Sequence, residues 1–560
     1  MPKHSARTRH GPPSTQSSLP KASSFTSSSS SPPSLDLECP AVQWATTVEE
    51  TGGQVAQGLA PLVVALFSLL LRWTTGLWPY SGAGIPPMYG DYEAQRHWME
   101  LTWHLPMTQW YRYDLQYWGL DYPPLTAYVS WVCGAVGNWI NPAWVALDVS
   151  RGYEDGPSKT FMRATVLVTD ILIYLPAAYG FARRYWAYTL HEGGVRAGSK
   201  PGTSRTFSPL STAALLLFLT QPALTIIDHG HFQYNSVMLG LVLHAYNAFW
   251  DRAYGRGAVL FTLALGFKQM ALYYALPIFT FLLGRCYRQR SLNQGLRLLV
   301  RLGLSVTLTI VALLLPFLRS IRDVQQVFIR IFPVGRGLYE DKVANLWCAL
   351  GPVLRLREKL SQPQLVRLSA IFTLVACLPV CIGLLIKPSP RKLIYGLASS
   401  SLAFFLLSYQ VHEKTILLPI LPISMLLVNE PVLVPWFINT ATFSMLPLLK
   451  RDGVIVPLLT GWALWNWLGG YFTTVIRAPH PVRWTVLGSY LVMGVALIVD
   501  LFIPPPGRLP DLWTMANVAI SAAIFSLSWA YLTARGLGYF AGPFPLEEPG
   551  MEVDEERKDQ

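Results

Sequence analysis

The chain has 560 residues, of which 52% are hydrophobic and only 14% are charged. Soluble domains carry roughly 25% charged residues, so this composition excludes an ordinary soluble protein and favours a membrane protein. The net charge is +12. The basic residues form short clusters between apolar runs instead of one patch, which argues against a nucleic-acid partner.

The two ends of the chain are polar. The first stretch is rich in Ser, Pro and Thr, and it includes the run from Ser27 to Ser31. Such a sequence has too few apolar residues to form a core, and we expect 1–55 to be a disordered tail. The charged end, 536–560, is expected to be a second tail. Residues 56–535 are expected to form an all-α, polytopic transmembrane helical bundle.

Apolar runs recur along this middle part. Roughly 20 apolar residues span a bilayer, and the runs predict about fourteen transmembrane helices. The polar loops 79–160 and 319–363 are expected to carry short amphipathic helices. In chain order the runs lie at 58–78, 161–182, 209–227, 236–250, 257–283, 299–318, 365–386, 393–408, 415–428, 432–449, 453–475, 484–503 and 512–534.

Clusters of Arg and Lys indicate how the bundle is oriented, because such clusters favour the cytosolic side of a membrane. With these clusters in the cytosol, both tails are cytosolic and the loops 79–160 and 319–363 lie on the opposite side. The clusters lie in the loops at 183–205, 285–297, 387–392 and 477–483.

This orientation makes two demands on the chain. Leu125–Ile140 must not cross the bilayer, and 257–283 must be two short helices broken near Lys268. Three basic residues depart from the rule, because they lie on the side that the other charges assign to the lumen. They are Lys450, Arg451 and Arg508.

The metal-binding residue types give a weak signal. The chain has six cysteines and no Cys-x-x-Cys pair, so we expect neither a disulfide framework nor a zinc site. His229 and His231 beside Asp228 have a spacing that a metal site permits but does not require. A structural or substrate-contacting role is favoured for the two histidines, and we expect neither a metal ion nor a cofactor.

Four segments on the non-cytosolic side combine carboxylates, cations and aromatic rings. The first contains GDYEAQRHW, WYRYD and YWGLDYPPL, the second DHGHFQYN, the third FPVGRGLYEDKV and the fourth QVHEK. Ionisable groups at a membrane boundary are by default candidates for a functional site. Composition alone leaves an enzyme, a transporter and a scaffold open.

These strings, together with GFKQMALYYA and the longer RGLYEDKVANLWC and SYQVHEKTILLP, resemble the dolichyl-phosphate-glucose-dependent glucosyltransferases of the lipid-linked oligosaccharide pathway. The resemblance covers 80–480 and implies a GT-C type membrane fold. It is strongest to the branch that adds the first glucose. That branch transfers glucose with inversion from dolichyl phosphate glucose to the terminal mannose of Man9GlcNAc2-PP-dolichol, forming an alpha-1,3 linkage.

The resemblance further implies an endoplasmic-reticulum membrane protein with a lumenal active site, acting in protein N-glycosylation. Two alternatives stay open. One is the paralogous branch that adds the second glucose and shares DYPP and HFQYN. The other is a membrane transporter or lipid scramblase, although the sequence has no internal repeat of the kind many transporters show.

The residue that matches the family's catalytic base is Asp91. An inverting transfer needs a base on the acceptor hydroxyl, and a carboxylate supplies one. The alternative for Asp91 is a helix N-cap, since Asp is common at that position. Glu93 and Arg96 are three residues apart on the same predicted helix, and they form either a surface pair or a substrate contact.

Other polar residues are candidates for substrate binding. Asp121 precedes a Tyr-Pro-Pro turn, and its carboxylate either bonds sugar hydroxyls or anchors the loop. His412, Lys414 and Arg336 are candidates to hold the donor phosphate, and the resemblance supports a cation at His412. The alternative for Lys414 is a side chain that extends to the membrane interface.

Overall fold

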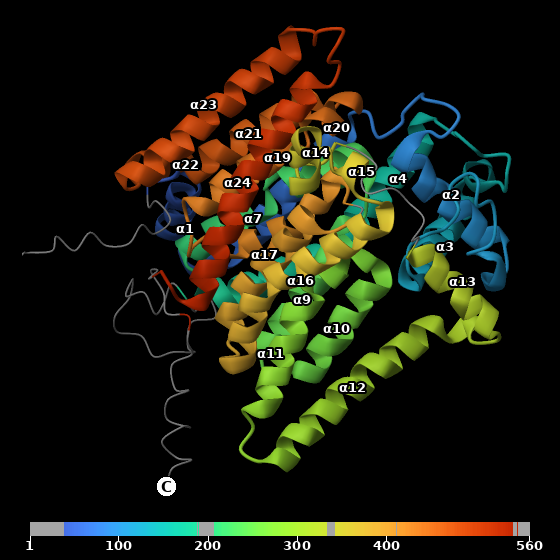
Figure 1. Cartoon of the computed structure of the whole chain (residues 1–560), viewed down its shortest axis with the longest axis horizontal. Helices are drawn as coiled ribbons and strands as arrows, with labels where there is room; N and C mark the ends of the chain where they lie inside the picture. The colour runs from blue at the N-terminus through green and yellow to red at the C-terminus, as the bar shows by residue number, and fades with distance from the viewer. Residues whose placement is uncertain are drawn as a thin grey trace, which may run out of the picture. The chain divides into compact units, whose positions relative to one another are not determined.

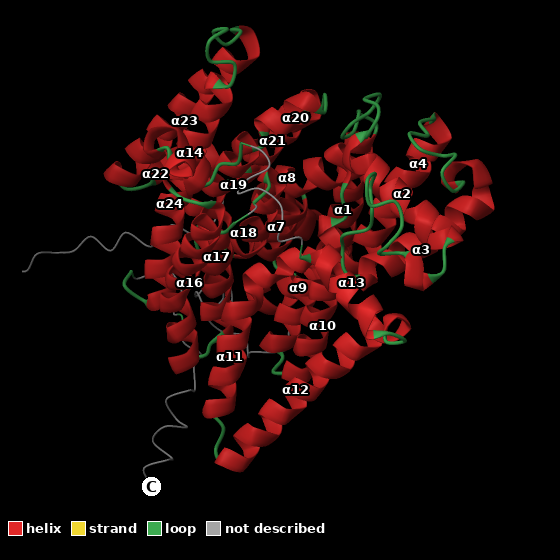
Figure 2. Cartoon of the chain, turned by 45° about the vertical axis from the view of Figure 1, so that its right-hand side comes forward, coloured by secondary structure: helices red, strands yellow, loops and turns green. Residues whose placement is uncertain are grey.

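The structure is a computed structural model that describes residues 38–187, 189, 207–332, 342–409, 411–540 and 546. These residues belong to one unit that covers 33–560. Every regular element in these ranges is a helix, and Figure 2 draws helices joined by loops. The predicted all-α fold is confirmed.

The α-helices in chain order are α1 (Pro40–Gly76), α2 (Gly90–His104), α3 (Pro124–Ile140), α4 (Gly156–Thr169), α5 (Leu175–Phe181), α7 (Pro209–Leu219), α8 (Pro222–Thr225), α9 (Asn235–Trp250), α10 (Tyr254–Phe267), α11 (Ala275–Tyr287), α12 (Leu292–Leu314), α13 (Ile321–Ile331), α14 (Leu346–Leu354), α15 (Leu356–Lys359), α16 (Gln362–Ile386), α17 (Pro390–Leu407), α18 (Leu417–Met425), α19 (Leu433–Ser444), α20 (Leu446–Arg451), α21 (Ile455–Gly469), α22 (Tyr471–Arg477), α23 (His480–Phe502) and α24 (Leu512–Leu537). Short 3₁₀ or π segments join them at η1 (Met107–Gln109), η2 (Pro142–Val145), η3 (Asp170–Tyr174), η4 (Ala182–Trp186), η5 (Ile226–Phe232), η6 (Gln269–Tyr274), η7 (Leu315–Phe317) and η8 (Glu413–Ile416).

Local capping sets where several of these helices begin. The side chains of Asp155, Ser208 and Asn345 each accept a hydrogen bond from the backbone N–H three residues further on, at 2.6, 3.2 and 2.8 Å. Such caps satisfy N–H groups that the first helical turn leaves without partners. These caps therefore mark where α4, α7 and α14 begin.

Eight helical stretches within the described residues are long and apolar enough to cross a membrane. The chain is therefore a polytopic membrane protein, as predicted, while the total of about fourteen crossings stays a prediction. The eight stretches are Pro40–Gly76, Gly156–Trp186, Pro209–Phe232, Gln269–Tyr287, Leu292–Phe317, Gln362–Ile386, His480–Phe502 and Leu512–Leu537.

The predicted break near Lys268 is confirmed. Helix α10 ends at Phe267, Lys268 has an extended backbone with φ −142° and ψ 119°, and α11 begins at Ala275. Helix α3 covers the segment that was predicted not to cross the bilayer. It has 17 residues and is not among the eight stretches, and its place relative to the bilayer stays a prediction.

The prediction that the disordered tail extends to residue 55 is wrong for residues 40–55, because α1 begins at Pro40. The first turn buries Ala41 and Val42. This apolar stretch is short and polar residues follow it, so no pattern in the sequence indicates a helix there. Gly53 interrupts the helix with φ 59°, a conformation that glycine adopts at little cost.

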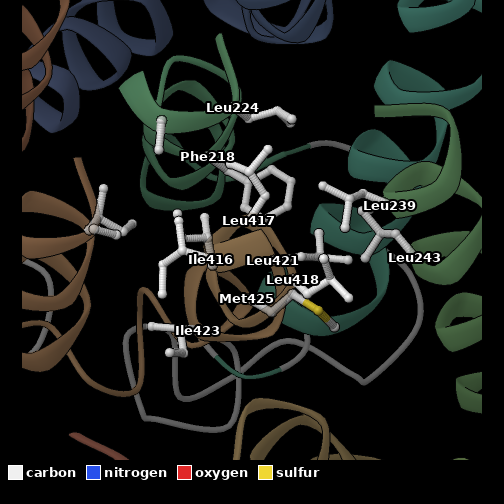
Figure 3. Close-up of a cluster of buried hydrophobic side chains, with 14 of the residues drawn as sticks. Phe218, Leu224, Leu239, Leu243, Ile416, Leu417, Leu418, Leu421, Ile423 and Met425 are labelled. Carbon is white, nitrogen blue, oxygen red and sulfur yellow. The ribbon is translucent and has the colours of Figure 1, made fainter. Parts of the chain in front are cut away.

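The main core lies where α7, α8, α9 and α18 meet. Figure 3 shows side chains from these helices in contact, with Phe218 and Leu224 above, Leu239 and Leu243 beside them, and Leu417 and its neighbours from α18 between. Ten of the 11 residues of α7 are buried, which is typical of a helix surrounded by other helices. Helix α12 is the opposite case, because only 6% of the residues in its apolar 18-residue stretch are buried. Figure 1 shows it running along the outside of the bundle.

A second, smaller core joins α2, α3 and α13. Its buried members include Trp98, Trp110, Tyr111, Phe317 and Val327. Figure 1 shows α2, α3 and α13 grouped together. This core holds the two polar loops of the sequence, 79–160 and 319–363, against each other, and α2 carries the predicted catalytic residue.

Candidate active site

Asp91 is the second residue of α2. The backbone before it is left-handed, with φ 55° at Tyr89 and 66° at Gly90. A Cβ on Gly90 would lie 2.6 Å from the carbonyl oxygen of Ser81, so the close approach of these two segments requires glycine there. The N-cap is Tyr89 and makes no side-chain cap bond. The alternative role of Asp91 as an N-cap is therefore wrong.

The two carboxylate oxygens of Asp91 have different surroundings. Oδ2 accepts a hydrogen bond from Nε2 of Gln233 at 2.8 Å, lies 2.7 Å from Nε2 of His231, and is paired with the ammonium of Lys414. Oδ1 has no hydrogen-bond or ion-pair partner within the described part of the chain. Asp91 therefore holds one oxygen fixed and keeps the other available.

The partners of Asp91 come from elements far away in the sequence. His231 lies in η5, Gln233 follows it directly, and Lys414 lies in η8, 323 residues after Asp91. The other ring nitrogen of His231, Nδ1, lies 2.6 Å from Oδ2 of Asp452, at the end of α20.

A chain of buried hydrogen bonds continues from Gln233 away from Asp91. Lys268, at the helix break, donates to Oε1 of Gln233 at 3.0 Å and to Oδ1 of Asn235 at 2.6 Å. Asn235 in turn donates to Asp228 at 2.8 Å. Buried polar groups are stable only when they are paired in this way. The extended backbone at Lys268 thus places a cation that orients the amide of Gln233.

A cavity of about 1090 Å³ opens beside Asp91. The size suits a ligand of several rings. Of the residues predicted from the sequence, the cavity brings together Asp91, Asp121, His231, His412 and Lys414. Arg336 lies outside the described residues.

Glu93 and Arg96 do not line the cavity. Each side chain is about 1% exposed, so the pair is neither a surface pair nor a direct substrate contact. Arg96 donates to Glu93 at 2.6 Å and to Glu100 at 2.7 Å, and the hydroxyl of Tyr117 donates to Glu93 at 3.0 Å. Because Tyr117 lines the cavity, the buried pair fixes part of the wall.

Glu100 completes this buried group. Burial by itself raises the pKa of Glu100. The ring of His97, whose Nδ1 lies 3.1 Å from Oε1 of Glu100, and the charge of Arg96 outweigh it and bring the pKa down to about 2. The carboxylate therefore stays charged at neutral pH and stabilises α2 from inside the protein.

His229 points away from His231. Its Nε2 lies 2.8 Å from Asp170, whose carboxylate also pairs with Arg72 at 2.8 Å, and it is not among the cavity residues. The two histidines thus contact different carboxylates and do not converge on one point. Across the described ranges, no group of three or more His, Cys, Asp or Glu is arranged to hold a metal ion.

The cavity contains polar residues that the sequence reasoning did not select. Gln233, Arg451 and Asp452 line it. Arg451 is exposed and has no hydrogen-bond or ion-pair partner within the described part of the chain. A signal for it existed, since Arg451 departs from the positive-inside rule, and an unexplained cation on the side that the other charges predict to be lumenal points to function.

Lys414 and Arg451 form a positive end of the cavity. Burial lowers the pKa of Lys414 to about 8, against the opposing effect of the Asp452 carboxylate and with a smaller lowering by the charge of Arg451. His412 lies two residues before Lys414 and also lines the cavity. Three cationic or protonatable groups therefore face a single space beside Asp91.

Another wall of the cavity is apolar and aromatic. Leu272 and Tyr273 from η6, Val366 from α16 and Phe404 from α17 belong to its lining. The rings of Tyr273 and Phe404 are stacked, with centroids 4.8 Å apart. One cavity therefore offers both a charged end and an apolar wall, which suits a ligand with a charged head and a hydrocarbon tail.

The segment that carries Asp121 is anchored by other residues. Arg330 of α13 donates to the carbonyl oxygens of Gly119 and Leu120 at 2.8 and 3.1 Å, and the indole of Trp98 donates to the carbonyl oxygen of Trp118 at 2.9 Å. The side chain of Asp121 lines the cavity.

Comparison with known proteins gives the family. A model described as the ALG6, ALG8 glycosyltransferase family matches residues 65–531. The dolichyl pyrophosphate Man9GlcNAc2 alpha-1,3-glucosyltransferase of Saccharomyces cerevisiae is 41% identical over 510 residues, which cover 85% of this chain and 91% of the yeast protein.

Two further relatives agree. The probable dolichyl pyrophosphate Man9GlcNAc2 alpha-1,3-glucosyltransferase of Schizosaccharomyces pombe is 44% identical over 474 residues, covering 83% of this chain and 90% of its own. The dolichyl pyrophosphate Man9GlcNAc2 alpha-1,3-glucosyltransferase of Gallus gallus is 40% identical over 501 residues, covering 84% and 95%. The resemblance seen in the sequence is confirmed, and the chain belongs to the ALG6, ALG8 glycosyltransferase family.

Proposed function

We propose that this chain transfers glucose, with inversion, from dolichyl phosphate glucose to the terminal mannose of Man9GlcNAc2-PP-dolichol and forms an alpha-1,3 linkage. The reaction belongs to the assembly of the lipid-linked oligosaccharide for protein N-glycosylation. The setting is the endoplasmic-reticulum membrane, with the active site on the lumenal side and both termini in the cytosol. The names of the relatives support the acceptor and the linkage.

Two kinds of surface in the cavity support this choice of donor. A polyprenyl phosphate sugar has a hydrocarbon tail, a single phosphate charge and a neutral sugar. The apolar side chains of Leu272, Val366 and Phe404 suit the tail. The side chains of His412, Lys414 and Arg451 suit the phosphate. Because the phosphate stays near the headgroup region while the tail stays in the bilayer, the glucose is presented next to the charged end.

The acceptor hydroxyl is deprotonated by Asp91, and we assign this step to Oδ1. The O–H bond of the mannose hydroxyl breaks as an O–H bond to Oδ1 forms. The mannose oxygen attacks the anomeric carbon of glucose from the face opposite the phosphate. The bond from carbon to the phosphate oxygen breaks, and its electron pair leaves with dolichyl phosphate. Such a base contributes about 10²–10⁴-fold to the rate.

Lys414 takes part both in holding Asp91 and in binding the donor phosphate. In the free protein its ammonium neutralises Oδ2 of Asp91. A donor phosphate competes for the same ammonium, so donor binding weakens the pairing that stabilises the ionised Asp91 and thereby increases its basicity. Asp121 and the ring of Trp118, which also line the cavity, are suited to contact sugar hydroxyls and sugar faces.

The observation that carries the proposal is the carboxylate of Asp91, with one oxygen held by three donors and the other without a partner. The test uses the purified chain, dolichyl phosphate glucose with labelled glucose, and lipid-linked acceptors bearing either no glucose or one. We expect product only with the acceptor that bears none. Product only with the glucosylated acceptor would assign the chain to the second step, and lipid movement without product would assign it to transport.

A further inference from the structure

His231 lies between two carboxylates. Its Nε2 is 2.7 Å from Oδ2 of Asp91 and its Nδ1 is 2.6 Å from Oδ2 of Asp452. The side chains of His231 and Asp452 are each 2% exposed, whereas that of Asp91 is 23% exposed. The row therefore runs from a buried carboxylate through a buried ring to the carboxylate at the cavity surface.

We infer that Asp452 and His231 position Asp91 for catalysis, an inference that rests on the proposed function. An ionised carboxylate accepts hydrogen bonds, and each imidazole nitrogen can take part in one. The Asp452 carboxylate therefore fixes the plane of the ring through Nδ1, and the ring fixes Oδ2 of Asp91 through Nε2. Oδ1 is left in one direction, toward the acceptor hydroxyl.

The backbone around Asp452 supports this role. Helix α20 ends in a turn in which Val454 N–H donates to the carbonyl of Leu449 at 3.1 Å and Gly453 N–H to that of Lys450 at 3.2 Å. Gly453 has φ 72°, as this helix ending requires. Asp452 is thereby held at the C-cap, although carboxylates are disfavoured at helix C-termini. The contact with His231 offsets that cost.

Asp452 is a positioning residue and makes its contribution through His231. Loss of its charge would let the ring turn and would release Oδ2 of Asp91 from one of its three donors. The base would then sample directions that do not reach the acceptor hydroxyl. A misplacement of about 1 Å costs on the order of 100-fold in rate, while the residues that bind the donor phosphate stay in place. The turnover number should therefore fall and the Michaelis constants should not rise.

The chain offers a matched control in a second buried pair. Asp170 lies 2.8 Å from Nε2 of His229, and both side chains are as inaccessible as those of Asp452 and His231. This pair does not reach Asp91. Asp170→Asn therefore reports what the loss of a buried carboxylate beside histidine does away from Asp91, although it also removes the carboxylate partner of Arg72.

The experiment is a double-mutant cycle on the purified full chain, with the turnover number and both Michaelis constants measured well below pH 8, so that Lys414 stays charged in every variant. Asp452→Asn should lower the turnover number about 10–100-fold with both constants unchanged, and Asp452→Glu should restore part of the rate. In a His231→Gln background, Asp452→Asn should have no further effect. Asp170→Asn should retain its own effect in that background.

Several outcomes would overturn the inference. In one, the rate losses of Asp452→Asn and His231→Gln multiply in the double variant. In another, a Michaelis constant rises while the turnover number is unchanged. In the third, Asp452→Glu is no faster than Asp452→Asn. If Asp452→Asn does not yield folded protein, Asp452→Glu takes its place in the cycle with His231→Gln and is judged by the same criteria. An unaltered chain that transfers no glucose would instead refute the proposed function.

Discussion

Asp91 makes its contacts through a single oxygen, and this leads to the first prediction. Asp91→Asn keeps the size of the side chain but cannot accept the proton of the acceptor hydroxyl. Asp91 does not cap α2, so the helix should still form. We expect glucose transfer by the purified variant to fall about 10²–10⁴-fold.

Asp121→Asn is the matched control for this prediction. It removes a second cavity carboxylate that the proposed reaction does not use as a base, and transfer should weaken less. Both variants are compared at equal thermal midpoint with the unaltered chain. Nearly normal turnover in Asp91→Asn would exclude Asp91 as the base.

The ammonium of Lys414 leads to a prediction on pH. Burial lowers its pKa from the ordinary value near 10.5 to about 8. The side chain is therefore charged below pH 8 and loses its charge as the pH rises through 8. The donor phosphate is a diester, and its charge does not change in this range. We expect the Michaelis constant for the donor to rise above pH 8.

Lys414→Arg tests this assignment, because a guanidinium stays charged throughout the range. In this variant the rise of the donor constant above pH 8 should disappear, whatever the absolute activity. The constant for the acceptor serves as the internal control and should not follow the same pH dependence. If the donor constant of Lys414→Arg still rose above pH 8, the rise would be due to another group.

At the scale of residues, the sequence predicted part of the site. Asp91 stood out because it matches the catalytic base of the family that the sequence resembles, and His412 and Lys414 stood out because they lie at the start of a predicted membrane helix. Asp452 did not, although it lies 2.6 Å from His231, because 221 residues separate the two. A contact of that separation leaves no trace in local spacing. The burial of Glu93 and Arg96 was missed for a related reason, since it depends on α3 and η2 packing over α2.

At the scale of elements, the apolar runs predicted the membrane helices well. The break at Lys268 was predicted because the charges on either side had to reach opposite faces. The first turns of α1 were missed because their apolar stretch is short. The π-helical segment η5, which sets the directions of His229 and His231, was missed as well, since its buried contacts and not its spacing determine it.

The turn after α20 gives a prediction at the same scale. Gly453 has φ 72°, and a Cβ there would meet only the ring of Pro79 at 3.7 Å, an ordinary contact. Gly453→Ala should therefore cost roughly 1–2 kcal/mol through backbone conformation alone. We expect a lower thermal midpoint and slower transfer, because the turn positions Asp452.

Gly453→Asn is the control for that change, because asparagine tolerates the left-handed region better than alanine. Its thermal midpoint and transfer rate should lie between those of the unaltered chain and Gly453→Ala. Equal behaviour of the two variants would show that side-chain volume, and not backbone conformation, limits this position.

At the scale of the whole bundle, the cavity lies at one end of the membrane helices. Lys450, next to the cavity residue Arg451, pairs with Asp500 near the end of α23 at 3.2 Å. The turn between α23 and α24 therefore lies at the cavity end. Helix α11 leads away from the cavity residue Leu272 for 13 residues, about 20 Å. The turn between α11 and α12 therefore lies at the other end.

These positions allow the orientation of the protein to be tested. The basic cluster between α11 and α12 predicts that this turn is cytosolic, so the cavity end should be lumenal. Gly507 and Arg290 are exposed residues of the two turns. In sealed endoplasmic-reticulum microsomes, we expect a membrane-impermeant maleimide to label Arg290→Cys at once. Gly507→Cys should react only after the membrane is permeabilised. The unaltered chain sets the background, because five of its six free cysteines are buried. The reverse order of labelling would place the active site in the cytosol and refute the proposed lumenal reaction.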